Sequence, residues 1–264
     1  MAALTAISWK RAVSRGIAEI YSLARAGQPA AGLRILLYHA VGTRLPSDPY
    51  GISIAPERFR KRMAALVRYP QVNTIALEPG WSTPANAMEV AITFDDGFRD
   101  TWTIAAPILH ALSLPFSVFI VPQYVTTGQP AYLTMAELRR LADVPGCSIG
   151  SHGMTHRRLA TLNDQDVDQE LRDSRRWIEQ VVQRPVTTVS YPHGSVDQRV
   201  RDAAARAGYQ LGVCSHHDLN RPGRDPLLLC RTEILGHDRV RVFEQKLLGG
   251  WDWRRLRHPD PQTV

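Results

Sequence analysis

The chain has 264 residues, of which 44% are hydrophobic and 22% are charged. This length fits one large α/β domain or two small ones, and it buries enough apolar surface to fold without covalent cross-links. The formal net charge is +7, but the basic residues are not interleaved with aromatic ones, so we expect no nucleic-acid partner.

Residues 1–27 carry apolar positions near helical spacing, with Lys10, Arg11 and Arg15 between them. The segment lacks the unbroken apolar core of a secretory signal peptide, and no stretch of the chain is long enough to span a bilayer. It fits an interfacial helix on an anionic membrane, or a helix packed against the rest of the protein. We therefore expect a cytoplasmic protein, with peripheral membrane contact through residues 1–27 as the alternative.

After a Gly- and Pro-containing break at 27–32, short apolar runs alternate with amphipathic segments. The apolar runs predict strands over 34–41, 89–94, 115–121, 147–151, 187–192, 209–214 and within 226–235. The amphipathic segments predict helices over 56–69, 101–112, 134–141, 163–182, 197–207 and 240–248. Such alternation is typical of a parallel sheet, either closed as a barrel or doubly wound.

Two short polar clusters come at the ends of predicted strands. The first is DDG, residues 95–97, and the second is SHGMTH, residues 151–156. Taken alone, DDG is often only a tight turn, and a His-x-x-x-His pair is more often solvated or packed than metal-binding. One carboxylate and two imidazoles are a common ligand set for zinc and related divalent metals. Because strand ends meet at one edge of such a sheet, the two clusters together indicate a metal-dependent active site.

Other chemistries have no support in the sequence. No GxGxxG or Walker-type loop follows a strand, and no GxSxG elbow is present. The three cysteines, Cys147, Cys214 and Cys230, form no CxxC motif. Their number and spacing argue against a disulfide framework and against a thiolate zinc site, so we interpret them as small buried apolar residues.

The motifs TFDDG at 93–97, SHGMTH at 151–156 and SYPHG at 190–194 resemble those of the polysaccharide deacetylase family, the carbohydrate esterases with a nodulation-protein homology domain. LLYHAV at 36–41 and RTEILGHD at 231–238 are similar to the branch that acts in exopolysaccharide synthesis. The resemblance covers roughly residues 33–250. It implies an α/β fold, an irregular (β/α)7 barrel with a single catalytic domain. We accordingly expect a leader over 1–30, the barrel over 31–252 and a tail over 253–264.

The resemblance implies hydrolysis of N-acetyl groups from an N-acetylhexosamine-containing polysaccharide or glycolipid. It makes Asp95 the general base, and Asp96, His152 and His156 the metal ligands. The ion would be divalent, with zinc preferred and cobalt, nickel or ferrous iron as alternatives. Such an ion activates water, while Asp95 accepts its proton. Hydrolysis of another small amide on the same fold, and an inactive glycan-binding relic, remain alternative functions.

Three further positions depart from the family pattern or vary within it. His193 stands where the family has Tyr in its Pro-Tyr-Gly motif, and its backbone N–H remains a candidate oxyanion donor. Ser190 occupies the position of an Arg that orients the base carboxylate, so Arg231 is a candidate substitute, with an ordinary surface Arg as the alternative. His237 is a candidate proton donor to the leaving amine, or only a loop residue. For His39, facing the barrel mouth and satisfying a core hydrogen bond are equally open.

Overall fold

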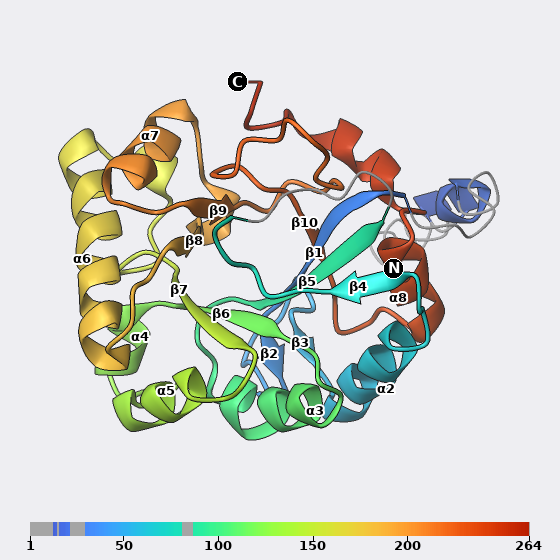
Figure 1. The fold of residues 1–264 in the computed structure, drawn as a ribbon, viewed down its shortest axis with the longest axis horizontal. Coiled ribbons are helices and arrows are strands. Elements are labelled where there is room, and N and C mark those ends of the chain that lie inside the picture. The colour runs from blue at the N-terminus through green and yellow to red at the C-terminus, as the bar shows by residue number, and fades with distance from the viewer. Residues whose placement is uncertain (1–12, 15, 22–29, 81–86, 264) are drawn as a thin grey trace.

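The computed structural model describes residues 13, 14, 16–21, 30–80 and 87–263. Parallel strands form the centre of the molecule and helices surround them (Figure 1). The strands are β1 (Gly32–Tyr38), β2 (Ala40–Val41), β3 (Ser53–Ile54), β4 (Val72–Thr74), β5 (Met88–Phe94), β6 (Phe116–Ile120), β7 (Cys147–Ser151), β8 (Thr188–Ser190), β9 (Leu211–Val213) and β10 (Arg231–Glu233).

The main sheet has the order β10-β1-β5-β6-β7-β8-β9, with β4 paired to β5 off this path. All of its strand pairs are parallel. Between the end strands, β9 and β10, a single parallel bridge joins Val213 to Leu229. The result is a nearly closed barrel of seven strands, and this confirms the (β/α)7 fold expected from the sequence.

Helices cover the outside of the barrel (Figure 1). They are α2 (Pro56–Leu66), α3 (Ala106–Ala111), α4 (Pro122–Thr126), α5 (Met135–Ala142), α6 (Asp164–Val182), α7 (Gln198–Arg206) and α8 (Val240–Leu247). Two predicted helix starts are confirmed, because Thr134 and Glu137 form a capping box on α5 and the Asn163 side chain caps α6.

Strand alternation divides the apolar side chains into an inner and an outer layer. Leu33, Ile35 and Phe119 belong to a small cluster inside the barrel. Their neighbours along the strands, such as Leu36 and Val118, belong to the larger core between the strands and the helices. Toward the C-terminal ends of the strands, past this inner apolar cluster, the side chains that point into the barrel are polar and belong to the site described below.

Some predicted elements have different boundaries. The segment predicted as one helix over 101–112 opens with a π-helical turn at Thr101–Ala105. Pro107 explains this, because it has no N–H to donate and the Ala106 N–H reaches back to Thr101 instead. The strand predicted over 187–192 ends at Ser190, where a 3-10 turn at Pro192–Gly194 begins. The sequence did not predict β3, β4 and α4, which are too short to show a period.

The described part of the leader is helical at residues 13, 14 and 16–21. Ala18 is buried, and Glu19 pairs with Arg241 of α8 at 2.8 Å. Ile20 is 67% exposed. None of the helices in the described ranges is long and apolar enough to cross a membrane.

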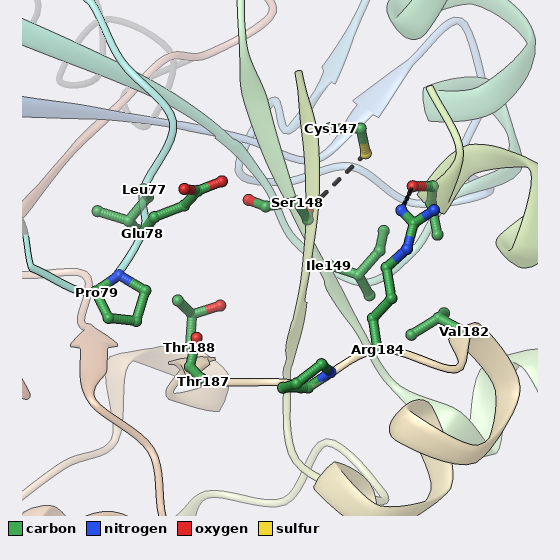
Figure 2. Close-up of a pocket in the computed structure, with 12 residues that line it drawn as sticks. Leu77, Glu78, Pro79, Cys147, Ser148, Ile149, Val182, Arg184, Thr187 and Thr188 are labelled. Carbon is green, nitrogen blue, oxygen red and sulfur yellow. Dashed lines mark hydrogen bonds between the residues drawn. The ribbon is translucent and has the colours of Figure 1, made fainter. Parts of the chain in front are cut away.

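A cavity of about 390 Å³ lies at the N-terminal ends of β7 and β8, which share only the register pair Ser151–Val189. Figure 2 shows Glu78 and Pro79 on one side of β7 and Arg184 on the other. The C-terminal ends of the same strands, at the opposite end of the barrel, carry the site described next.

Candidate metal centre

Three strands bring most of the predicted site residues to the C-terminal end of the barrel. Asp95 and Asp96 follow β5, His152 follows β7, and His193 follows β8. Arg231 begins β10 and pairs in register with Ile35 of β1, so it lies within the barrel wall.

The DDG sequence turns the chain sharply after β5. The Asp95 N–H still donates to the Tyr38 carbonyl, but Asp96 and Gly97 both have φ of 72°. Aspartate tolerates this left-handed conformation, and glycine adopts it without steric cost. A Cβ at Gly97 would also come within 3.2 Å of the Ile120 side chain. The turn therefore directs the two adjacent carboxylates to different partners.

Asp96, His152 and His156 converge on one point. Asp96 Oδ1 lies 3.5 Å from His152 Nε2 and 3.3 Å from His156 Nε2. Two ligand atoms that are each about 2.0–2.1 Å from a tetrahedral ion lie about 3.4 Å apart. Asp96 Oδ1 is buried and has no hydrogen-bond partner. An unpaired buried oxygen facing two imidazole nitrogens at this spacing fits a divalent metal ion.

Neighbouring groups hold the imidazoles in the orientation that an ion needs. His152 Nδ1 lies 2.7 Å from the Ser190 carbonyl, so this nitrogen carries the proton and Nε2 faces Asp96 with its lone pair. The loop between the two histidines is held by Glu170 of α6, which accepts hydrogen bonds from the N–H groups of Met154 and Thr155 at 2.8 and 3.0 Å.

Asp95 has different partners from Asp96. Arg231 donates to both of its oxygens, at 2.8 and 2.7 Å, and Ser190 Oγ donates to Oδ2 at 3.0 Å. The Arg231 guanidinium also donates to Ser190 Oγ and to the Cys214 carbonyl. Arg231 is 1% exposed, so it is not a surface residue. Ser190 thus contacts both members of the pair formed by Asp95 and Arg231.

The electrostatics of the two carboxylates differ accordingly. Burial raises the pKa of both, but the charge and hydrogen bonds of Arg231 outweigh it at Asp95 and hold that pKa well below its usual range. Burial and the nearby Asp95 charge raise the pKa of Asp96 to about 7. Burial lowers the pKa of His152 to about 4 and that of His156 to about 3, so both imidazoles are neutral at pH 7, as metal ligands must be.

His193 and two tyrosines border the metal centre. His193 has φ of 57°, and its ring lies 4.4 Å from the His156 ring. Burial and the Arg158 charge lower the pKa of His193, against a hydrogen bond to the His156 backbone. Tyr124 and Tyr132 stack on each other at 4.4 Å, and the Tyr124 ring lies 5.7 Å from His156. These residues form a half-exposed aromatic edge beside the centre.

The histidines whose roles the sequence left open lie in different surroundings. His39 follows β1, and its charge interacts with those of Asp95, Arg231 and Asp48. Burial lowers the pKa of His39, while the Asp95 and Asp48 charges raise it. His237 is exposed and contacts the turn at Gly51.

His216 and His217 follow β9, and their carboxylate neighbours are not the two aspartates of the centre. The main ones are Asp260 for His216 and Asp252 for His217. The sequence reading also missed Glu170. The one feature of the sequence that could have indicated its role is its position, because an acidic residue there lies in the apolar face of the helix, between Val167 and Leu171.

The model of the family described as Polysaccharide deacetylase matches residues 82–212. The chain is 32% identical over 124 residues to a Bacillus subtilis protein named "Putative polysaccharide deacetylase YxkH", a match over 47% of this chain and 43% of that protein. It is 28% identical over 146 residues to the peptidoglycan-N-acetylglucosamine deacetylase of Bacillus cereus, over 55% of this chain and 65% of that protein. The matches thus span less than two thirds of each curated relative.

Among solved structures, the fold is similar to that of the Streptococcus pyogenes deacetylase PplD in complex with acetate. The TM-score is 0.72 at 22% sequence identity, and the similarity covers 83% of this chain and 99% of the other. At that identity the likeness concerns the fold. The family match extends from just before the first cluster, at Asp95, through the second, at His152, to β9.

Proposed function

Because this chain belongs to the polysaccharide deacetylase family, we propose that it hydrolyses N-acetyl groups of an N-acetylhexosamine-containing polysaccharide or glycolipid, with a divalent metal as cofactor. The observation that carries the proposal is the convergence of Asp96 Oδ1 on two imidazole nitrogens at 3.5 and 3.3 Å, beside a separately held carboxylate. One carboxylate serves as a ligand, and the other is available for proton transfer.

Zinc is the metal we propose, because Asp-His-His leaves open coordination positions in the manner of catalytic zinc sites. Cobalt, nickel and ferrous iron accept the same donors. The bound ion would supply Lewis acidity toward the acetyl carbonyl and lower the pKa of water.

Asp95 is the proposed general base, and Arg231 is its positioning residue. The two hydrogen bonds from the guanidinium fix the plane of the carboxylate, and Ser190 fixes Oδ2. The same pairing makes Asp95 a weak base, since its pKa is held low. The benefit of the pair is therefore orientation, together with a carboxylate that stays ionised beside Asp96 at all pH values of interest.

The oxyanion of the tetrahedral intermediate needs a donor from the chain. We propose the backbone N–H of His193, which follows Pro192 in the turn after β8. This role needs no particular side chain, so it tolerates histidine where the family has tyrosine.

Protonation of the leaving amine requires a general acid. His39 and His237 are the two candidates for this general acid, and their surroundings favour His39. His39 follows β1 among the charges of Asp95, Arg231 and Asp48, whereas His237 is exposed against Gly51. Burial lowers the pKa of His39, so as general acid it would have to gain its proton during the reaction. If His39 is the acid, His39→Ala lowers kcat by about two orders of magnitude or more with unchanged metal content. His237→Ala, the matched control, then retains near-normal kcat; the reverse result assigns the role to His237.

Glycan recognition is supported by the aromatic edge of Tyr124 and Tyr132. Flat half-exposed rings beside a reacting centre offer an apolar face and a hydroxyl, which suits a sugar ring. The named activity of the Bacillus cereus relative and the acetate in complex with the Streptococcus pyogenes deacetylase point to the same chemical class. Tyr124→Phe should act mildly, and Tyr124→Ala should raise KM for oligomers more than it lowers kcat.

The test is hydrolysis of N-acetylglucosamine oligomers by metal-loaded protein, with acetate and free amine quantified together. We expect equal amounts of both products. Release of acetate only from a small non-sugar amide would assign the enzyme to another substrate, and no release from either, with metal bound, would favour an inactive glycan-binding protein.

A further inference from the structure

The barrel closes at its seam, between β9 and β10, without a regular strand ladder. Hydrogen bonds between β9 and the loop before β10 replace it. The Leu229 N–H donates to the Gly212 carbonyl, and the Cys214 N–H donates to the Leu229 carbonyl. Further up, the Arg231 N–H donates to the His216 carbonyl and its Nε to the Cys214 carbonyl. The seam therefore holds the guanidinium that pairs with Asp95.

Three metal-binding side chains meet on this seam. One ligand atom each from His216, Cys230 and Asp260 lies within 4.8 Å of the others. The Cys214 thiol, just after β9, donates to the Leu229 carbonyl at 3.3 Å and lies beside the Cys230 thiol, outside the group of three. The two cysteines are fully buried, while His216 and Asp260 close the group from the solvent side. The group of three comes from the segment after β9, from the residue before β10 and from the C-terminal segment.

The donor set is borderline-soft, with one sulfur, one imidazole and one carboxylate. Zinc and similar ions accept this combination, whereas magnesium and calcium prefer oxygen alone. Arg224 donates to Asp260 Oδ2 at 2.5 Å and, through Nε, to the Leu228 carbonyl at 2.7 Å. It holds the carboxylate as outer-shell partners of metal ligands do. Without an ion, the same residues are a buried thiol beside a surface ion pair.

We propose that His216, Cys230 and Asp260 form a second metal site, with Cys230 as its thiolate ligand and zinc as the fitting ion. It would fasten β9 to the start of β10 and tie the C-terminal segment to both. Because Cys230 precedes Arg231, and the carbonyls of Cys214 and His216 accept from Arg231, the ion would stabilise the segment that orients Asp95. This inference does not depend on the deacetylase function, since the site shares no ligand with Asp96, His152 and His156.

Cobalt binding separates the two sites, because only a thiolate ligand gives an intense sulfur-to-cobalt absorption in the near-ultraviolet. The full chain is stripped of metal under reducing conditions and titrated with Co²⁺. We expect the absorption in the natural protein and in His152→Ala, which lacks a ligand of the other centre. Cys147→Ser, which removes a cysteine on β7, is the matched control and should retain it. Cys230→Ser should lose it.

Substitution of a buried cysteine risks the fold, so two half-exposed ligands provide independent variants. His216→Ala and Asp260→Asn, with native circular dichroism, should each weaken Co²⁺ binding at the thiolate site by about tenfold or more. Absence of the absorption in the natural protein overturns the proposal, as does its persistence in Cys230→Ser or unchanged affinity in both half-exposed variants. A thiol count on denatured, unreduced protein that finds only one free thiol would also overturn it, since Cys214 and Cys230 would then be a disulfide.

Discussion

Removal of the Arg231 guanidinium should reveal how strongly the seam of the barrel depends on its ion pair. Arg231→Met keeps an apolar side chain of similar length but deletes both hydrogen bonds to Asp95 and those to Ser190 and Cys214. The Asp95 carboxylate is left buried beside Asp96. Breaking a buried pair in this way costs about 3–5 kcal/mol, because one charge stays desolvated without a partner.

The free energy of unfolding should be measured in urea on the metal-free protein, because bound metal adds stability of its own. With a slope of about 3 kcal/mol per molar urea, the midpoint falls by roughly 1–1.7 M. In the double variant Arg231→Met/Asp95→Asn the loss should shrink, giving a coupling energy on the order of 2 kcal/mol. Arg241→Met is the control: its partner is Glu19, and both side chains are largely exposed, so the midpoint should hardly move.

The loss should also depend on pH. Pairing with Arg231 holds the pKa of Asp95 in the folded protein below its value in the unfolded chain. The pair therefore stabilises the protein at pH values above the unfolded pKa. This stabilisation is lost as the pH falls through the folded-state pKa. Without Arg231, burial raises the pKa of Asp95. The difference between the two proteins is therefore largest near neutral pH and shrinks toward about pH 4. A difference that is independent of pH, or no coupling with Asp95→Asn, would refute the reasoning.

Three further predictions concern the aspartates and the leader. In the Cys230→Ser background, which removes the thiolate of the second site, Asp95→Asn should retain metal but lose about two to four orders of magnitude in kcat, whereas Asp96→Asn should lose metal; elemental analysis and acetate release distinguish this from exchanged roles. Because the pKa of metal-free Asp96 is about 7, zinc binding in the same background should release close to one proton per chain at about pH 6 and far less near pH 8.5. Calorimetry in buffers of different ionisation enthalpy measures this, and equal release at both pH values would contradict it. Deleting residues 1–27 should leave turnover of soluble oligomers intact and, if the leader is interfacial, weaken binding to anionic vesicles most at low salt; equal binding leaves the leader as packing on α8.

The barrel was predictable because each strand–helix unit carries its own periodicity and end signals. The strand before Asp95, the cap at Asn163 and the capping box at Thr134 are local features, and the structure reproduces them. The convergence of the strand ends then follows from parallel pairing alone. Short pieces such as β4 and α4 have too few residues to show a period, and their formation depends on tertiary contacts.

Within the site, the aspartate and histidine motifs could be identified because their members lie close together in the sequence. Partners that lie far apart could not be assigned. Arg231 is 136 residues from Asp95, and only the barrel closure brings them together. Glu170 looked like an ordinary helix residue, although it holds the loop that carries His156. The thiols of Cys214 and Cys230 approach each other across the seam, so no local CxxC signal marked them.

The most direct test of the central claim is a titration of the metal-free Cys230→Ser protein with zinc, so that only the first centre takes up the metal. Bound zinc and acetate release from an N-acetylglucosamine oligomer are measured in the same samples. We predict that turnover rises in proportion to occupancy of the centre formed by Asp96, His152 and His156. In His152→Ala, neither that occupancy nor turnover should appear. Full turnover in the metal-free protein, or in His152→Ala, would contradict the claim.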